Sequence, residues 1–268
     1  MKPGKLWLYI ISLFLLSCLV VEGLSSMELY RRWNSPYYFR QMRITEGVME
    51  PLAEKYGYGS RSFIEGVTEK MLQFQFNPDE QQKVHSKGIL WYKLLQKPLW
   101  SRYYSWYETI LKDLECFPVP GDQQGQETVS FDNSWMGERT YGGKRFHEGC
   151  DIMTSNNVRG YFPVVSMTGG VVEQIGWLEK GGYRVGVRSP SGAYFYYAHL
   201  YDYAEGLEKG DVVTPGQMLG HMGDSGYGKL EGTVGKFDVH LHVGIYYDVD
   251  GQEISVNPYY LLKYLKNK

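Results

Sequence analysis

The sequence predicts an α+β fold, in which an N-terminal helical region precedes a C-terminal antiparallel β-sheet domain. Two observations predict this order. Between residues 27 and 117, apolar side chains recur at helical spacing between capping and helix-ending residues. Over residues 127–268, short runs rich in Val, Tyr and Ile alternate with glycine-containing turns, which is the pattern of antiparallel strands and hairpins. The chain of 268 residues is long enough for one large domain or two modest ones.

Residues 1–26 are expected to form a signal peptide or a membrane anchor. Lys2 and Lys5 precede an uncharged apolar run over residues 6–21, and Glu22 ends it. A basic start followed by such a run directs export or anchors a chain in a membrane, and the length of this run lies between the two cases. A buried helix is the alternative. We therefore expect the rest of the chain to lie outside the cytoplasm.

Four helices are expected in residues 27–117, which we interpret as an accessory helical region. The first begins at the cap over residues 34–36 and ends at Gly57. The second carries a row of apolar side chains on one face: Phe63, Val67, Met71 and Phe74. The third opens at residues 77–80, and the fourth covers residues 105–117. No cluster of potential metal ligands occurs in this part of the sequence, so its role is not predicted.

Residues 118–126 are rich in proline, glycine and glutamine, a composition that indicates a linker or a domain edge. Cys116 and Cys150 lie on either side of this segment. They could form a disulfide in an oxidising compartment or remain two buried free thiols, and the sequence leaves both open.

The overall charge and the aromatic content narrow the class of partner only slightly. A formal net charge of -2 gives no support for a nucleic-acid partner. The 24 tyrosines fit either a groove that contacts polar ligands or ordinary packing.

Three histidines of the β domain are predicted to lie on strand faces. His240 and His242 are two apart in a strand pattern, so both imidazoles should point to the same side. Such a pair suits a metal site better than a core, where each buried ring nitrogen needs a partner. His199 ends the run "AYFYYAHL", and alternation places it on the face of Phe195 and Tyr197.

His147 and Asp151 lie four apart in "HEGCD", with Gly149 between them. We expect the glycine to let the chain turn, so that both side chains aim at one ion and a strand supplies the next ligand. Catalytic zinc commonly takes three protein ligands, with histidine nitrogens and a carboxylate oxygen among the usual donors, and keeps one position for water. The sequence has no HExxH motif, so the remaining histidines are the candidates for accepting a proton.

These motifs, in this order, resemble those of the LytM/lysostaphin-type zinc endopeptidases, which cleave peptide cross-links in bacterial peptidoglycan. The resemblance extends over residues 129–260 and does not include the helical region. The segments that carry it are "GERTYGGKRFHEGCDIM", "YYAHL", "LEKGDVVTPGQMLGHMGDSG" and "VHLHVGI".

The resemblance implies one zinc ion per chain, held by His147, Asp151 and His242. It also implies a β domain with an open groove, because a cross-linked polymer cannot enter a closed pocket. The partner would be a peptide of peptidoglycan.

The resemblance also implies roles for three further residues. His240 and His199 match the two non-ligand histidines that handle the proton or steady the transition state. Asn133 lies where the family often has a polar residue that lines the substrate groove. His221 matches no such role, and we expect it at a turn or on the surface.

Two departures from the family pattern concern the surroundings of the site. The segment "YGKLEGTVGKFD" before His240 is longer and more charged than usual, which could reshape one wall of the groove. Gly244 stands where the family usually has glutamate, and it matches no ligand.

The expected function is therefore that of an extracytoplasmic zinc metalloendopeptidase acting on peptidoglycan. Two alternatives come from other functional classes. The same fold could serve as a non-catalytic cell-wall-binding, regulatory or scaffold module, because fold alone does not fix function. The chain could also be a structural, membrane-anchored protein whose helical part assembles with partners. A complete ligand set argues against the first alternative, and zinc-independent behaviour would support the second.

Overall fold

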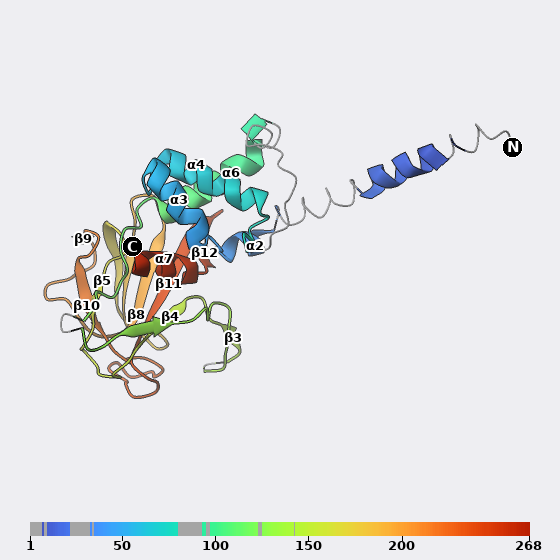
Figure 1. Cartoon of the computed structure of the whole chain (residues 1–268). Coiled ribbons are helices and arrows are strands. Elements are labelled where there is room, and N and C mark those ends of the chain that lie inside the picture. Colours follow the sequence, from blue (N-terminus) through green and yellow to red (C-terminus); the bar gives the residue numbers. More distant parts are fainter. Residues whose placement is uncertain are drawn as a thin grey trace.

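The computed structural model describes residues 7, 10–21, 33, 35–79, 93–94, 97–122, 125–141 and 143–268. The predicted α+β architecture is confirmed, because N-terminal helices precede a sheet of ten strands in these residues (Figure 1). Helices α3, α4 and α6 gather above the sheet in the view of Figure 1, and the C-terminal helix α7 lies against the strands.

The main sheet follows one path of hydrogen-bonded neighbours, and every strand pairing in the described residues is antiparallel. Along that path its strands are β1 (Val129–Phe131), β4 (Cys150–Thr154), β11 (His240–Val249), β8 (Tyr194–Tyr203), β7 (Gly182–Arg188), β6 (Gly170–Leu178) and β9 (Val212–Val213). Three further strands join it: β5 (Pro163–Val165), β10 (Met218–Met222) and β12 (Gln252–Val256). A separate ribbon pairs β2 (Glu138–Arg139) with β3 (Arg145–Phe146).

The helices differ from the predicted ones in their bounds. They are α2 (Pro36–Arg40), α3 (Glu46–Tyr56), α4 (Arg61–Gln73), α6 (Lys97–Leu111) and α7 (Tyr259–Asn267). The predicted first helix is divided, because the chain leaves helical geometry at Met42, whose φ is 45°. The fourth begins at Lys97 rather than at residue 105, and it ends at Leu111. The predicted third helix lies mostly outside the described residues, and α7 was not predicted.

Helix α4 agrees best with the sequence pattern. Its cap Ser60 accepts a hydrogen bond from the backbone N–H of Phe63, as expected of a serine at a helix start. Phe63, Val67 and Met71 are buried on one face, whereas Phe74 follows the end of the helix and is half-buried.

Helices and sheet share one hydrophobic core, which is centred on Phe39 of α2. Its fully buried ring lies 4.9–5.7 Å from the rings of four aromatic residues: Tyr103, Trp106 and Tyr107 of α6, and Tyr247 of β11. Aromatic contacts of this kind bury large apolar areas. The helical region therefore supports β11, the strand that begins with His240 and His242.

The segment predicted to be a linker has no regular secondary structure at residues 118–122. It is nevertheless anchored, because Pro118 and Val119 are buried and Val119 belongs to the hydrophobic core. The Pro118 carbonyl also accepts a hydrogen bond from the N–H of Val165 in β5.

Cys116 and Cys150 are free thiols in the structure. Cys116 donates to the carbonyl of Ser166 at 3.1 Å, and Cys150 donates to the carbonyl of Asp132 at 3.3 Å. Burial raises the pKa of the Cys150 thiol to about 12, and the nearby Asp151 carboxylate adds to this effect. Cys150 is therefore held protonated, which makes it a poor metal ligand although it adjoins Asp151.

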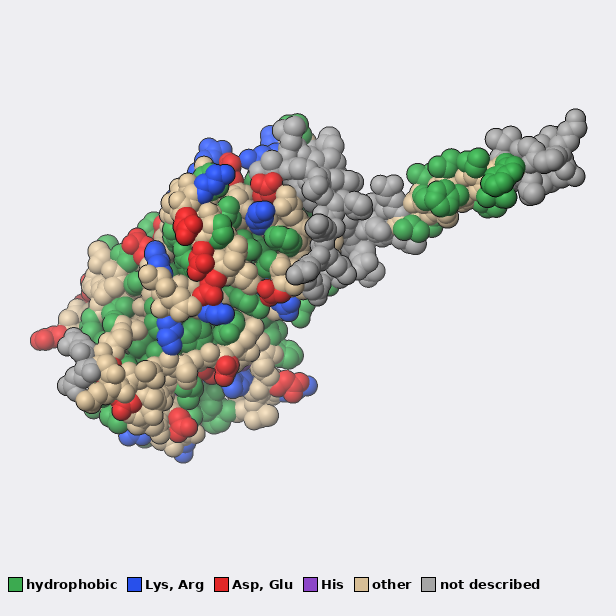
Figure 2. Space-filling view, viewed as in Figure 1, with side chains coloured by type: hydrophobic (Ala, Val, Ile, Leu, Met, Phe, Trp, Pro, Cys, Tyr) green, Lys and Arg blue, Asp and Glu red, His purple; other side chains and the backbone are tan. Residues whose placement is uncertain are grey.

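Residues 10–21 are helical, and their side chains are exposed. Figure 2 shows that hydrophobic side chains cover most of this segment, whereas acidic and basic side chains are interspersed over the other helices. Among the helices that the structure describes, none has the length and apolar character needed to cross a membrane. The expectation of a signal peptide or anchor at residues 1–26 stays a prediction, and part of it lies outside the described residues.

We predict that Phe39→Ala lowers the free energy of unfolding by about 3–5 kcal/mol, because it leaves a cavity among buried aromatic rings. Urea denaturation followed by tryptophan fluorescence measures this loss. The matched control is Tyr37→Ala, since Tyr37 lies on the same short helix and is 54% exposed. Its effect should stay within about 0.5 kcal/mol. Equal losses in the two variants would show that the helical region does not depend on this contact.

Candidate metal centre

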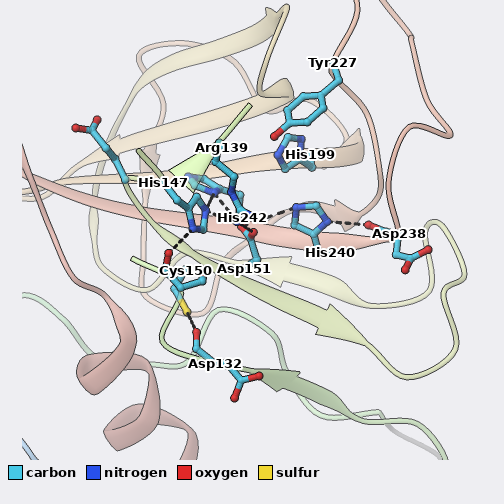
Figure 3. A network of polar contacts seen from close by, with 12 residues as sticks. Asp132, Arg139, His147, Cys150, Asp151, His199, Tyr227, Asp238, His240 and His242 are labelled. Carbon is cyan, nitrogen blue, oxygen red and sulfur yellow. Dashed lines mark hydrogen bonds and ion pairs between the residues drawn. The ribbon is translucent and has the colours of Figure 1, made fainter. Parts of the chain in front are cut away.

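The pairing of β4 with β11 brings the first two candidate ligands together. In this register His242 lies directly opposite Asp151, so their side chains share one face of the sheet. Nδ1 of His242 lies 3.0 Å from Oδ1 of Asp151. His147 comes from the segment before β4, and its Nε2 lies 2.9 Å from Nδ1 of His242 and 3.0 Å from the same carboxylate oxygen (Figure 3). The predicted ligands therefore converge on one point.

The chemistry of these three groups fits a cation. Nδ1 of His147 donates to the carbonyl oxygen of Ser134 at 3.0 Å, which leaves Nε2 of a neutral ring as a lone pair directed at the cluster. The other two groups present a second imidazole nitrogen and a carboxylate oxygen. Three such acceptors at about 3 Å repel one another unless a proton or a metal ion lies between them. Two imidazoles and one carboxylate are ligands that zinc takes in catalytic sites.

Gly149 lies at a bend, as predicted, and it has a second, steric role. It lacks the positive φ that would require a glycine, but a Cβ at this position would lie 2.5 Å from Cε1 of His242 and 2.5 Å from the carbonyl oxygen of Val243. Real Cβ atoms do not approach other atoms so closely. The glycine therefore makes room for the His242 imidazole at a bend of the chain.

Arg139 holds the carboxylate from the other side. Its Nη2 lies 2.5 Å from Oδ2 of Asp151, which leaves Oδ1 directed at the two imidazoles. Burial alone would raise the pKa of Asp151, but the adjoining imidazoles of His147, His242 and His240 together lower it overall. The residue is therefore an anion, as a metal ligand must be. Sequence analysis assigned no role to Arg139, although it belongs to the quoted segment that precedes His147.

Two further histidines lie beside the cluster. Nδ1 of His240 donates to the carbonyl of Asp238, and Nδ1 of His199 donates to the carbonyl of Ser225, each at 2.7 Å. Both rings therefore keep Nε2 as an acceptor. Nε2 of His240 lies 3.8 Å from Oδ1 of Asp151, and the two histidine rings are 4.8 Å apart.

Electrostatics keeps His199 neutral. Its pKa lies well below the ordinary value, mainly because the ring is buried, and the neighbouring His240 and His242 lower it further. A neutral imidazole with one fixed N–H can accept a proton or a hydrogen bond at the other nitrogen.

The prediction that His199 shares a strand face with Phe195 and Tyr197 is wrong. Phe195 and Tyr197 are fully buried in the core, whereas Ala198 pairs with His242 and faces the site. His199 reaches the same side because the β7–β8 register shifts between Tyr197 and Leu200, and the φ of His199 is 63°. This is a β-bulge, which commonly re-aims a side chain near an active site.

A cavity of about 420 Å³ surrounds the five site residues. Tyr196 and Tyr246 line one part of it, and Tyr227 lines another. Phe146, on its rim, is 50% exposed, so the cavity opens to solvent.

Asn133 and His221 lie apart from the cavity lining. Oδ1 of Asn133 accepts a hydrogen bond from Nδ2 of Asn257 at 3.0 Å, and its predicted contact with substrate stays a prediction. His221 bonds to Asp202 through Nδ1 at 2.8 Å and is partly exposed, consistent with the expected surface position.

An open β-sheet site with two histidines, one aspartate and two further histidines defines a metallopeptidase-type centre. Residues 145–258 match peptidase family M23, and the chain belongs to this family.

Two known proteins are similar to this chain in sequence, and one of them also in structure. The structure of a protein from Ruminococcus gnavus, assigned as a glycyl-glycine endopeptidase LytM, is 44% identical, with a TM-score of 0.74. The match covers 89% of this chain and 96% of that one. An L-Ala–D-Glu endopeptidase of Bacillus subtilis is 45% identical over 144 residues, which are 54% of this chain and 41% of the relative. The chain therefore spans about two fifths of the length of the curated relative it matches.

We predict that Gly149→Ala lowers zinc affinity at least tenfold, because the added methyl group displaces the His242 ring from its place opposite Asp151. Competition with a fluorescent zinc chelator measures the affinity. Gly121→Ala is the matched control, since nothing lies within 4 Å of a Cβ at that position and its φ is ordinary. Unchanged zinc affinity in Gly149→Ala would contradict the steric role of this glycine.

Proposed function

We propose that this protein is a zinc metalloendopeptidase that hydrolyses a peptide bond of bacterial peptidoglycan. The observation that carries the proposal is the convergence of His147, Asp151 and His242, beside two more histidines, in a cavity that is open to solvent. Membership of a peptidase family supports it, as do relatives that are named as endopeptidases.

His147, through Nε2, His242, through Nδ1, and Asp151, through Oδ1, would hold the zinc ion. Bound there, zinc would supply a Lewis acid that polarises a carbonyl and makes water more acidic. Arg139 fixes the Asp151 carboxylate, and the Ser134 carbonyl fixes the His147 ring. These contacts set the ligand atoms in place before a metal ion binds.

His240 is the proposed general base. Its Nε2 is nearest to the ligand cluster, at 3.8 Å from Asp151, and it is free to accept the proton of the attacking water. The Asp238 carbonyl bonded to Nδ1 stabilises the imidazolium that results. The protonated ring can then return the proton to the leaving amine.

His199 is proposed to contact the reacting group from the side opposite to His240. It is held by the Ser225 carbonyl and by the backbone of β8, and burial keeps it neutral in the resting state. With its proton held on Nδ1, the neutral ring offers Nε2 as an acceptor, so it can accept a hydrogen bond from the attacking water and orient it.

We also propose that the protein acts outside the cytoplasm, where peptidoglycan lies, and that residues 1–26 serve as its export signal or anchor. The basic start and the apolar run over residues 6–21 support this proposal. The alternative of a non-catalytic binding module is less well supported, because none of the candidate ligands is replaced in this chain.

We predict that His240→Ala lowers kcat on purified peptidoglycan at least hundredfold while zinc content stays at one ion per chain. Release of soluble fragments, identified by mass spectrometry, measures activity, and elemental analysis measures zinc. His221→Ala is the control, because it removes a histidine from the same sheet outside the cavity, and it should retain full activity. A fully active His240→Ala variant would exclude this residue as the base.

Removal of the metal should abolish peptide release, and readdition of zinc should restore it, because the three ligands alone supply no Lewis acid. Dialysis against 1,10-phenanthroline, followed by the same digestion, tests this. Peptide release that survives complete removal of the metal would contradict a metallopeptidase mechanism.

A further inference from the structure

We propose that Arg145 and Lys180 form a subsite for a free carboxylate on the peptide substrate, carried by a residue that flanks the scissile bond. The inference rests on the proposed function and names the chemistry of its substrate. Both side chains line the same cavity as the candidate metal ligands.

Arg145 is presented to the cavity without an acidic partner. Its Nη2 donates to the hydroxyl of Tyr227 at 2.8 Å, and its guanidinium lies over the Tyr227 ring. The Tyr227 ring stacks on Tyr141 at 4.2 Å, which limits the movement of the pair. No salt bridge joins Arg145 to an acidic group in the described part of the chain. A held guanidinium with free N–H groups is well suited to bind a carboxylate.

Lys180 lines the same cavity from the turn between β6 and β7. Its backbone is fixed, since the next residue, Gly181, accepts a hydrogen bond from the N–H of His199 at 2.8 Å. The carbonyl of Lys180 lies against Gly226, directly before Tyr227. Its side chain is exposed, and over the residues described it too has no salt bridge. Arg145 thus lies at the Tyr227 end of the cavity, and Lys180 is a second cation of the cavity lining without a salt bridge among the described residues.

The remaining charges leave this end positive. Arg139 is paired with Asp151, so it contributes little to the field that a ligand meets. Glu148 also lines the cavity, but it lies at the other end, where its carbonyl accepts from the hydroxyl of Tyr246. Burial and, to a smaller extent, the Glu148 charge both raise the pKa of Tyr246. The cavity is thus basic at one end and acidic at the other.

This polarity distinguishes between two kinds of substrate. The two relatives are named for different bonds, glycyl-glycine in one and L-Ala–D-Glu in the other. A glycine chain carries no charge between its ends, so two unpaired cations would gain nothing from it. A glutamate joined through one carboxyl group keeps the other as a carboxylate, which matches the basic end. We therefore assign this chain to acidic peptides.

The test compares two synthetic peptides that differ in one group. One contains L-Ala–D-Glu with the second carboxyl group of glutamate free, and in the other that group is an amide. Pentaglycine is a third substrate. For the full zinc-loaded chain we expect kcat/KM for the acid to exceed that for the amide about tenfold. A difference of this size corresponds to one charge-assisted hydrogen bond that only the acid can form. The difference should shrink as salt concentration rises.

Arg145→Gln and Lys180→Gln should each reduce the acid-to-amide ratio, mainly by raising KM for the acid more than KM for the amide. Lys144→Gln is the matched control. Lys144 adjoins Arg145 but pairs with Glu138 at 3.1 Å and does not line the cavity, so the ratio should be unaffected. A merely structural role of Arg145 would lower cleavage of both peptides equally and leave the ratio unchanged.

Calorimetric titration of both peptides into the His240→Ala variant separates this inference from the proposed function. Tighter binding of the acid, lost in the double variant with Arg145→Gln, supports the subsite even if no peptide is cleaved, and only the proposed activity then fails. Equal binding of acid and amide overturns the subsite. Preferred cleavage of pentaglycine overturns it as well, although the peptidase activity then stands.

Discussion

The structure depends on the mutual repulsion of three acceptor groups that the fold forces together. His242 and Asp151 cannot avoid each other, because the β4–β11 register places them side by side on one face of the sheet. His147 is added from the preceding segment, and its ring is fixed by a backbone carbonyl. Holding the three groups together costs free energy when no cation is bound, and a bound cation removes this cost. Cation binding therefore stabilises the fold. The Arg139 guanidinium offsets part of this cost from behind the carboxylate.

The helical region acquires a physical role in this arrangement, although it contributes no residue to the cavity lining. Phe39 and the aromatic residues of α6 pack against Tyr247, on the same strand as His240 and His242. Arg40 adds hydrogen bonds to the carbonyl and hydroxyl of Ser255 on β12, the neighbour of β11. Site geometry held to within a fraction of an ångström needs such support from outside the site. The helices thus stabilise the position of β11 by packing against it.

The resemblance to the zinc endopeptidases implied which three residues converge, and strand parity and short spacing, which are local properties, agree with it. His240 and His242 share a face wherever they form a strand, and His147 and Asp151 are joined by three residues. Contacts between distant segments were beyond such reasoning. The space that Gly149 leaves for His242 involves residues 93 positions apart, so the bend at this glycine was predicted but its steric role was not. The early start of α6 likewise accompanies burial of Trp100 and Tyr103 in the hydrophobic core, which the spacing pattern did not reveal. His199 was misplaced because a bulge breaks the alternation on which the prediction depended.

The β-bulge at His199 also means that this histidine could be lost without disturbing the pairing of β8 with β7. Tyr197 and Leu200 keep their partners on β7 on either side of the irregular position, so regular pairing would need one residue fewer. Loss of the single codon for His199 would relieve a left-handed backbone conformation and leave the rest of β8 in register. The sheet, its core and the metal ligands would survive such a deletion, whereas one of the two non-ligand histidines would not. A one-residue deletion at this bulge would therefore remove a proposed functional histidine while the strand pairings on either side of it are kept.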